Sequence, residues 1–286
     1  MKRVCIFPHY YDLEEIPIYV KIYVTELSNY FDEIIIVTNR RQIENRIEIE
    51  SDKINILEVD NEGYDFGMFY KGYQTIKDQD FDTVACINDS NIVFGSLKAL
   101  FDWGFNQNID FWGLADANIK PPFSTHAENY HVQSHFLVFN KQAINYFDEY
   151  FEQLDITQIF SLTDQKATKR RIITDWEIGV SQFLLSKKLK AKAYFQYNQF
   201  DLSAFAKNPA FNLPLDLFPQ IIKRGLPIIK KRIITSAKPK DYLNFRNNWR
   251  YLIKKYGNPT WNIDQLLVEL KQIRNRHFLN KIRKII

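Results

Sequence analysis

Apolar residues recur in two different rhythms along the first two thirds of the chain. Four short runs are almost wholly apolar, as expected for strands inside a parallel sheet. They are RVCIF (3–7), EIIIVT (33–38), INILEV (54–59) and TVACIN (83–88). Other apolar side chains return at the three- and four-residue spacing of an amphipathic helix. These are Ile16, Val20, Tyr23, Val24 and Leu27, and further on Phe66, Phe69, Tyr70, Tyr73 and Ile76.

The resulting order of strand, helix, strand, strand, helix and strand predicts an α/β fold on a mixed, mostly parallel central sheet. Further strands are expected at DFWGLA (110–115), HFLVF (135–139) and KAYFQ (192–196). A helix is expected from about Lys141 to Gln153, then a polar, basic loop over 163–171 and a helix that carries Trp176 and Val180.

The distribution of charge separates the end of the chain from the rest. Residues 223–286 hold 17 Lys and Arg against 3 Asp and Glu, a balance of +14, whereas the first 222 residues have a balance of −10. We therefore predict an α/β domain over residues 1–237 and a basic helical extension over residues 238–286. Such asymmetry suggests an anionic partner for the basic end.

The extension has two interpretations. Its helical pattern sets Leu270, Ile273, Phe278, Ile282 and Ile285 beside basic residues, as in a helix that lies on the anionic inner leaflet of a membrane. Equally, the helix could pack on its own domain or on a second copy. Nucleic acid is not expected as a partner, because no known recognition motif or aromatic platform is present.

Composition fits an ordinary cytoplasmic protein. Hydrophobic residues make up 45% of the 286 and charged residues 25%. The two cysteines, Cys5 and Cys86, lie in apolar runs and suggest buried thiols in a reducing compartment. We find neither a signal peptide nor an apolar run long enough to span a membrane. The expected location is the cytoplasm, with peripheral attachment at the inner face of the plasma membrane through the basic end.

Three predicted strands end abruptly in polar residues, and ligands of open α/β sheets bind at such carboxyl ends. Each of the three ends has a structural alternative. The loop at 61–67 could cradle a phosphate, or Asp65 could simply cap the helix. The NDSN segment at 88–91 could bind Mg²⁺ or Mn²⁺ through Asp89 and Asn91, or it could be a turn. The polar residues of the three ends are His9 and Tyr10, then Asn61, Gly63, Asp65 and Gly67, then Asn88, Asp89, Ser90 and Asn91.

A fourth candidate segment is TDWEIG, at the start of a predicted helix. Asp175 or Glu177 could act as a general base on an acceptor hydroxyl, although acidic residues are also common in the first turn of a helix. His126, His131 and His135 lie within ten residues of one another, but their spacing matches no standard zinc site. We expect these histidines to pack or to form hydrogen bonds.

Taken together, these segments resemble the rhamnan synthesis protein F family over about residues 4–235. The resemblance rests on an ordered set of motifs: HYYDL, NEGYDFGMFYKGY, CINDSNIVFGSL, DFWGLAD, YHVQSHFLVFNKQAI, DWEIGVSQFLL and GLPIIKKRII. It implies a GT-A type, Rossmann-like nucleotide-sugar fold and a glycosyltransferase (hexosyltransferase) that assembles bacterial cell-surface polysaccharide. The donor would be a nucleotide-diphosphate sugar, with rhamnose suggested by the family name. The acceptor would be a polysaccharide or lipid-linked oligosaccharide.

The resemblance also implies roles for individual residues. Glu177 would be the base of an inverting displacement, and a divalent cation at Asp89 would stabilise the leaving diphosphate. Donor contacts would come from His9, Tyr10, Asn61, Gly63, Asp65, Gly67, Asn88, Asp89 and Ser90, and acceptor contacts from His131, Gln133 and Ser134. The chain departs from the DxD metal motif of GT-A enzymes, because Asn88 and Asn91 stand where acids would. That departure favours the alternative of a non-catalytic scaffold in polysaccharide assembly. A weaker alternative is another transferase, for example of phosphoglycerol.

Overall fold

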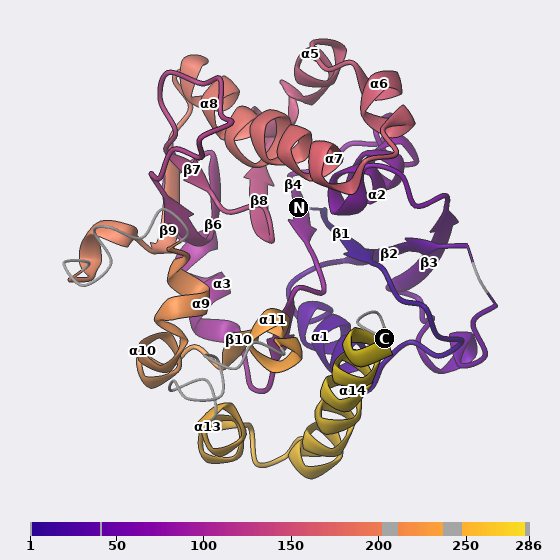
Figure 1. Cartoon of the computed structure of the whole chain (residues 1–286). Coiled ribbons are helices and arrows are strands. Elements are labelled where there is room, and N and C mark those ends of the chain that lie inside the picture. The colour runs from indigo at the N-terminus through magenta and orange to yellow at the C-terminus, as the bar shows by residue number, and fades with distance from the viewer. Residues whose placement is uncertain (1, 41, 202–210, 237–247, 284–286) are drawn as a thin grey trace.

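A mixed eight-stranded sheet forms the centre of the molecule (Figure 1). The computed structural model describes residues 2–40, 42–201, 211–236 and 248–283. The strands follow the order β3-β2-β1-β4-β8-β6-β7, and β9 pairs with β6. Their bounds are Arg3–His9 (β1), Glu33–Asn39 (β2), Ile54–Val59 (β3), Thr83–Ile87 (β4), Phe111–Ala117 (β6), His131–Val132 (β7), Phe136–Asn140 (β8) and Ala191–Phe195 (β9).

Most strand pairs of this sheet are parallel. The pairs β1–β2, β2–β3, β1–β4 and β6–β9 run parallel, whereas β4–β8, β6–β8 and β6–β7 run antiparallel. The prediction of a mixed, mostly parallel α/β fold is therefore confirmed. Because β1 pairs in parallel with both β2 and β4, the carboxyl ends of these three strands lie at the same edge of the sheet.

Each face of the sheet is covered by its own helices, because side chains along a strand alternate between faces. On β1, Cys5 and Phe7 join one core cluster, and Val4 and Ile6 join the other. The first face packs against α1 (Ile18–Leu27), α3 (Lys98–Phe105), α10 (Phe218–Lys223), α11 (Lys231–Thr235), α13 (Trp249–Tyr256) and α14 (Ile263–Arg283). The second packs against α2 (Tyr64–Gln74), α4 (Lys141–Ile144), α5 (Phe147–Glu152), α6 (Ile156–Ser161), α7 (Gln165–Ile172) and α8 (Gly179–Ser186).

Two of the expected elements differ from the structure. The expected loop over 163–171 is mostly helix α7, and Asp164 caps it by accepting a hydrogen bond from the Ala167 N–H at 2.6 Å. Only Thr168 and Ile172 of this helix are buried, so it shows almost no apolar stripe. The expected helix from Lys141 to Gln153 is divided into α4 and α5.

Several short elements lie outside the predicted pattern. β5 (Asn91–Val93) pairs antiparallel with β10 (Ile228–Lys230) in a small second sheet. A π-helical turn, η2 (Ile173–Ile178), joins α7 to α8. Other short helices in the described ranges are α9 (Leu213–Asp216), η1 (Arg46–Glu48) and η3 (Tyr197–Gln199).

The basic C-terminal helix packs against the α/β domain. Leu266, Leu270 and Ile273 of α14 are buried in the same cluster as β1 and α1, and Figure 1 shows α14 running beside α1. The predicted boundary between residues 237 and 238 lies outside the described residues, as do Ile285 and the side chain of Ile282. Among the described helices, none is at once long and apolar enough to cross a bilayer.

Candidate functional site

A cleft of about 880 Å³ opens at the carboxyl ends of the parallel strands. It brings together six of the residues predicted from the sequence: Asp65, Asn88, Ser90, Gln133, Ser134 and Glu177. Five basic side chains also line it: Lys166, Lys169, Lys230, Lys231 and Arg232. Because Asp65 and Glu177 are the acidic residues of the described lining, positive charge is in excess.

The start of α2 places Asp65 in this cleft. Gly63 has φ +66° and Tyr64 φ +52°, so the chain enters the helix through two consecutive left-handed residues. Such a conformation is unusual for tyrosine and is often found at functional sites. Gly67 lies one turn later, where a Cβ would stand 1.8 Å from the Glu62 carbonyl oxygen. Gly63 and Gly67 thus shape the loop through the backbone.

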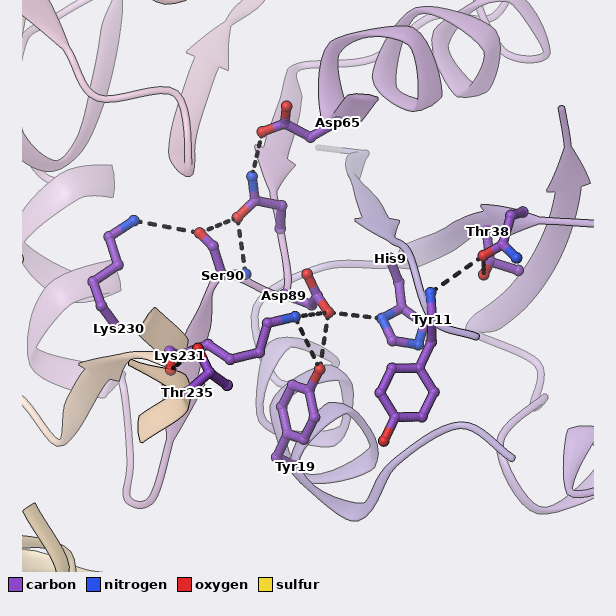
Figure 2. A network of polar contacts seen from close by, with 12 residues as sticks. His9, Tyr11, Tyr19, Thr38, Asp65, Asp89, Ser90, Lys230, Lys231 and Thr235 are labelled. Atoms are coloured by element: carbon purple, nitrogen blue, oxygen red, sulfur yellow. Dashed lines mark hydrogen bonds and ion pairs between the residues drawn. The ribbon is translucent and has the colours of Figure 1, made fainter. Parts of the chain in front are cut away.

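Asp65 is linked to the end of β4 by a short chain of hydrogen bonds. The Asn88 Nδ2 donates to Asp65 Oδ2 at 2.6 Å, and Asn88 Oδ1 accepts from Ser90 N at 3.1 Å and Ser90 Oγ at 2.5 Å. Burial and the nearby charge of Glu177 raise the pKa of Asp65. Asp65 and Ser90 therefore hold fixed orientations on one wall of the cleft (Figure 2).

Glu177 enters the cleft from the π-helical turn η2. Ser134 Oγ donates to its Oε2 at 2.8 Å, and His131 Nε2 lies 3.4 Å from its Oε1. The His131 Nδ1 lies 2.7 Å from the Asn129 carbonyl oxygen, which can only accept a hydrogen bond, so Nδ1 carries a proton. Burial lowers the pKa of His131, but the hydrogen bond and charge of Glu177 outweigh it and raise that pKa.

Glu177 itself is held in its ionised form. Burial would raise the pKa of Glu177, but His131, Ser134 and the charge of Lys230 together lower it. An ionised carboxylate inside a cleft can accept a proton from a hydroxyl that is bound next to it.

Asp89 lies just behind the lining of the cleft, and its Oδ2 accepts three hydrogen bonds. The donors are Lys231 Nζ at 2.5 Å, His9 Nδ1 at 2.9 Å and Tyr19 OH at 2.9 Å (Figure 2). Burial would raise the pKa of Asp89, but the charges and hydrogen bonds of Lys231 and His9 hold it well below its usual value. Asp89 is therefore the counter-ion of Lys231.

The two predicted metal ligands bind different protein groups. Asn91 Nδ2 donates to His135 Nδ1 at 2.9 Å, while Asp89 pairs with Lys231. His135 Nε2 in turn lies 3.1 Å from Gln133 Oε1, and burial holds the pKa of His135 well below its usual value. Across the described part of the chain, no three His, Cys, Asp or Glu side chains form a group able to hold a metal ion. These residues do not fit a divalent cation.

Other predicted residues lie outside the cleft. Asp175 faces a separate pocket of about 420 Å³ and pairs with Arg171. Tyr10 is 53% exposed and Asn61 is exposed, and neither lines the cleft, whereas His9 is buried behind Asp89. His126, the third histidine of the group, is hydrogen-bonded to the Thr174 carbonyl at 2.8 Å.

The basic residues of the cleft were missed as site residues. Lys230 Nζ donates to Ser90 Oγ at 3.3 Å, from a position 140 residues later in the chain. Burial lowers the pKa of Lys230 to about 7, although the charges of Glu177 and Asp65 oppose this effect. The GLPIIKKRII segment carries a signal for them, but in the sequence its lysines do not stand out from the other basic residues of 223–286.

Comparison with known proteins gives a family match and several distant structural similarities. The model of the family described as rhamnan synthesis protein F matches residues 34–278, which extends well past residue 238. None of the curated protein sequences compared with the chain matches it.

Two of the similar solved structures have low sequence identity to this chain. A Bacillus anthracis protein assigned as a glucose-1-phosphate thymidylyltransferase is 12% identical, with a TM-score of 0.44 over 68% of this chain and 87% of that one. The glycosyltransferase GlyE of Streptococcus pneumoniae TIGR4 is 13% identical, with a TM-score of 0.39. The match covers 97% of this chain and 64% of the GlyE chain.

Proposed function

Because the chain belongs to the rhamnan synthesis protein F family, we propose that it transfers a sugar from a nucleotide-diphosphate donor to a hydroxyl of a growing bacterial surface polysaccharide. The observation that carries this proposal is a single cleft in which an ionised carboxylate, Glu177, faces a basic wall. A carboxylate suits deprotonation of an acceptor hydroxyl, and a basic wall suits the phosphates of the donor.

The mechanism that this arrangement supports is a single displacement with inversion. Glu177 takes the proton of the acceptor hydroxyl while the oxygen of that hydroxyl attacks the anomeric carbon of the donor sugar. The bond from that carbon to the phosphate oxygen breaks, and its electron pair remains on the leaving nucleoside diphosphate. Asp65, fixed by Asn88, is placed to bind hydroxyl groups of the sugar. We propose a hexose as the transferred sugar, with rhamnose as the first candidate.

Substitution of the two candidate bases tests the proposal. Glu177→Gln is expected to lower sugar transfer by roughly 100-fold or more, because a positioned general base contributes about that much. Asp175→Asn is expected to retain activity, because its carboxylate faces Arg171 in the separate pocket. The measurement is release of nucleoside diphosphate from a panel of nucleotide-rhamnose and nucleotide-hexose donors, with thermal melting to verify folding.

The same assay distinguishes a glycosyltransferase from a non-catalytic scaffold. If no donor in the panel supports transfer by the wild-type protein, the non-catalytic role in polysaccharide assembly replaces the enzymatic one. If Glu177→Gln remains fully active, the proposed base is wrong.

We further propose that the acceptor is lipid-linked and that α14 brings the protein to the membrane surface. Val268, Phe278 and Leu279 of this helix are 56%, 44% and 54% exposed, close in sequence to Lys271, Arg274 and Arg276. Apolar and basic side chains together bind anionic bilayers. Co-sedimentation is expected with phosphatidylglycerol vesicles and not with phosphatidylcholine vesicles. Equal binding to both, or to neither, would contradict this attachment.

A further inference from the structure

The polar end of β4 faces two consecutive lysines from a distant part of the chain. The pairing of β10 with β5 sets Lys230 opposite Asn91, and the next backbone N–H, that of Lys231, donates to the Ser90 carbonyl at 2.8 Å. This register carries both side chains to the NDS turn, where Figure 2 shows them pointing toward Ser90 and Asp89. A strand pairing, which cannot slip without inverting its side chains, therefore fixes the two ammonium groups.

Lys231 is held in place by two hydrogen bonds and keeps donor capacity beyond them. Its Nζ donates to Asp89 Oδ2 at 2.5 Å and to Tyr19 OH at 3.2 Å. An ammonium group has three N–H donors, so one remains beyond these two contacts. The Lys231 side chain is 25% exposed and lines the cleft, which leaves that donor available to a ligand.

Lys230 stands on the same wall with its charge less well compensated. The contact of its Nζ with Ser90 Oγ, at 3.3 Å, uses one donor, and the carboxylates that act on it are Glu177 and Asp65. Glu177 is already paired with His131 and Ser134, and Asp65 with Asn88. An anion bound beside Lys230 would pair with an ammonium group that is partly shielded from water. Such a pair attracts more strongly than one with an exposed lysine.

The position that a divalent cation would occupy thus holds protein cations instead. At the polar strand end, Asp89 Oδ2 is saturated by three donors, one of them Lys231. A metal ligated through this oxygen would have to displace an ammonium group from a buried ion pair, which is costly. The charge that a diphosphate needs is supplied from within the chain, with Lys166, Lys169 and Arg232 lining the same cleft.

We propose that Lys230 and Lys231 bind the diphosphate of the donor directly and neutralise the leaving group without a divalent cation. The identity of the ligand rests on the proposed glycosyltransfer. As the bond between the anomeric carbon and the phosphate oxygen breaks, the electron pair stays on that oxygen. The two ammonium groups stabilise the added charge, and the acceptor proton goes to Glu177. Asp89 is a positioning residue in this scheme, because it acts through Lys231.

Titration calorimetry with inorganic pyrophosphate tests the site, in EDTA and in buffered Mg²⁺. The wild-type protein is expected to bind in EDTA. Lys230→Gln and Lys231→Gln are each expected to weaken binding by roughly tenfold or more, because each removes a charge-assisted contact. Lys254→Gln is the matched control, since Lys254 is 74% exposed on α13 and away from the cleft; its binding should be unchanged.

Since Lys231→Gln strips Asp89 of its counter-ion, Lys231→Arg provides a folded variant that keeps the charge. Lys231→Arg is expected to bind pyrophosphate far better than Lys231→Gln, whereas equal loss in both would argue against charge as the cause. Binding that appears only with Mg²⁺, or that survives both lysine-to-glutamine substitutions, overturns the proposal.

The outcomes separate this site from the function on which it rests. If pyrophosphate binds in EDTA through the lysines and no donor supports sugar transfer, the phosphate site stands and the glycosyltransferase proposal fails. If transfer occurs and is abolished by EDTA, the glycosyltransferase proposal stands and the metal-free site is overturned.

Discussion

At the scale of single residues, one oxygen of Asp89 joins three elements of the fold. Its hydrogen-bond donors are His9 at the end of β1, Tyr19 in α1 and Lys231 at the start of α11. Removing the charge of this buried carboxylate lowers the stability of the fold, because its partners are then left without their hydrogen bonds and ion pair. Asp89, at the end of β4, therefore links β1, α1 and α11 just behind the lining of the cleft.

We expect Asp89→Asn to destabilise the fold by about 3–5 kcal/mol, the usual cost of breaking a buried ion pair from one side. Lys231→Met in the same chain should restore part of the loss, because it removes the unpaired ammonium. Chemical denaturation of the two single variants and the double variant measures this coupling. Additive losses would show that the two groups are not coupled in the fold.

The pH dependence of the wild-type protein should carry the same signature. The folded pKa of Asp89 lies below the unfolded value of about 3.9. Its stabilising contribution is therefore complete above that value and is lost as the pH falls through the folded pKa. Asp89→Asn should flatten this acid limb of the stability curve.

At the scale of elements, the first turn of α2 depends on one close approach between backbones. A Cβ on Gly67 would lie 1.8 Å from the Glu62 carbonyl oxygen, which belongs to the turn that presents Asp65. At Gly72, on the same helix, a Cβ would instead meet methyl groups of Ile6 and Val37 at 2.8 Å. Methyl groups can shift by side-chain rotation, whereas a carbonyl moves only with its backbone.

Gly67→Ala is accordingly expected to cost more than Gly72→Ala, by about 1–3 kcal/mol, the range for overpacking of a fixed site. It should also lower donor binding, because the turn before Asp65 must move. Thermal melting and donor titration of the two variants provide the comparison. Equal effects would mean that the loop at 61–67 relaxes freely.

How much of this could be predicted from the sequence differs by element. The runs that became β1–β4 have a strong signal, because strands buried on both faces are almost wholly apolar. The sequence predicts a loop where α7 forms, because seven of its eight residues, QKATKRR, are polar or small and its apolar side is narrow. The strands β5 and β10 have three residues each, too short for any periodicity.

The candidate site shows the same division. Asp65, Asn88, Ser90 and Glu177 could be found because each follows a strand or opens a helix at a polar break. The partners Lys230 and Lys231 could not, because 140 and 142 residues separate them from Ser90 and Asp89 and only the β5–β10 pairing joins them. The opposite orientation of Asp175 was also hidden, since it depends on the π-helical turn η2.

At the scale of the whole molecule, the basic C-terminal helices are part of the main core. Trp249, Leu252 and Ile253 of α13 and Leu266, Leu270 and Ile273 of α14 are all buried within the cluster that includes Phe7 and Tyr19. Each large apolar side chain contributes about 1.5–3 kcal/mol when buried. Together they match the roughly 5–15 kcal/mol by which a whole domain is usually stable.

A chain that ends at residue 237 is therefore expected to lack a cooperative thermal transition and to lose donor binding. A chain that ends at residue 279 retains all six buried side chains and is the matched control. Circular dichroism during heating measures both. A sharp transition for the shorter chain near that of the full-length protein would support the independent domain over residues 1–237.

The carboxylate of Glu269 accepts hydrogen bonds from the Ile18 and Tyr19 N–H groups, at 2.7 and 3.0 Å, and so caps α1 from α14. These partners lie 251 and 250 residues apart in the chain. At about 5–20 residues per second, the ribosome makes the cap roughly 10–50 s after the helix that needs it. Until Glu269 is made, the Ile18 and Tyr19 N–H groups lack this cap, so we expect α1 to reach its full stability only late in synthesis.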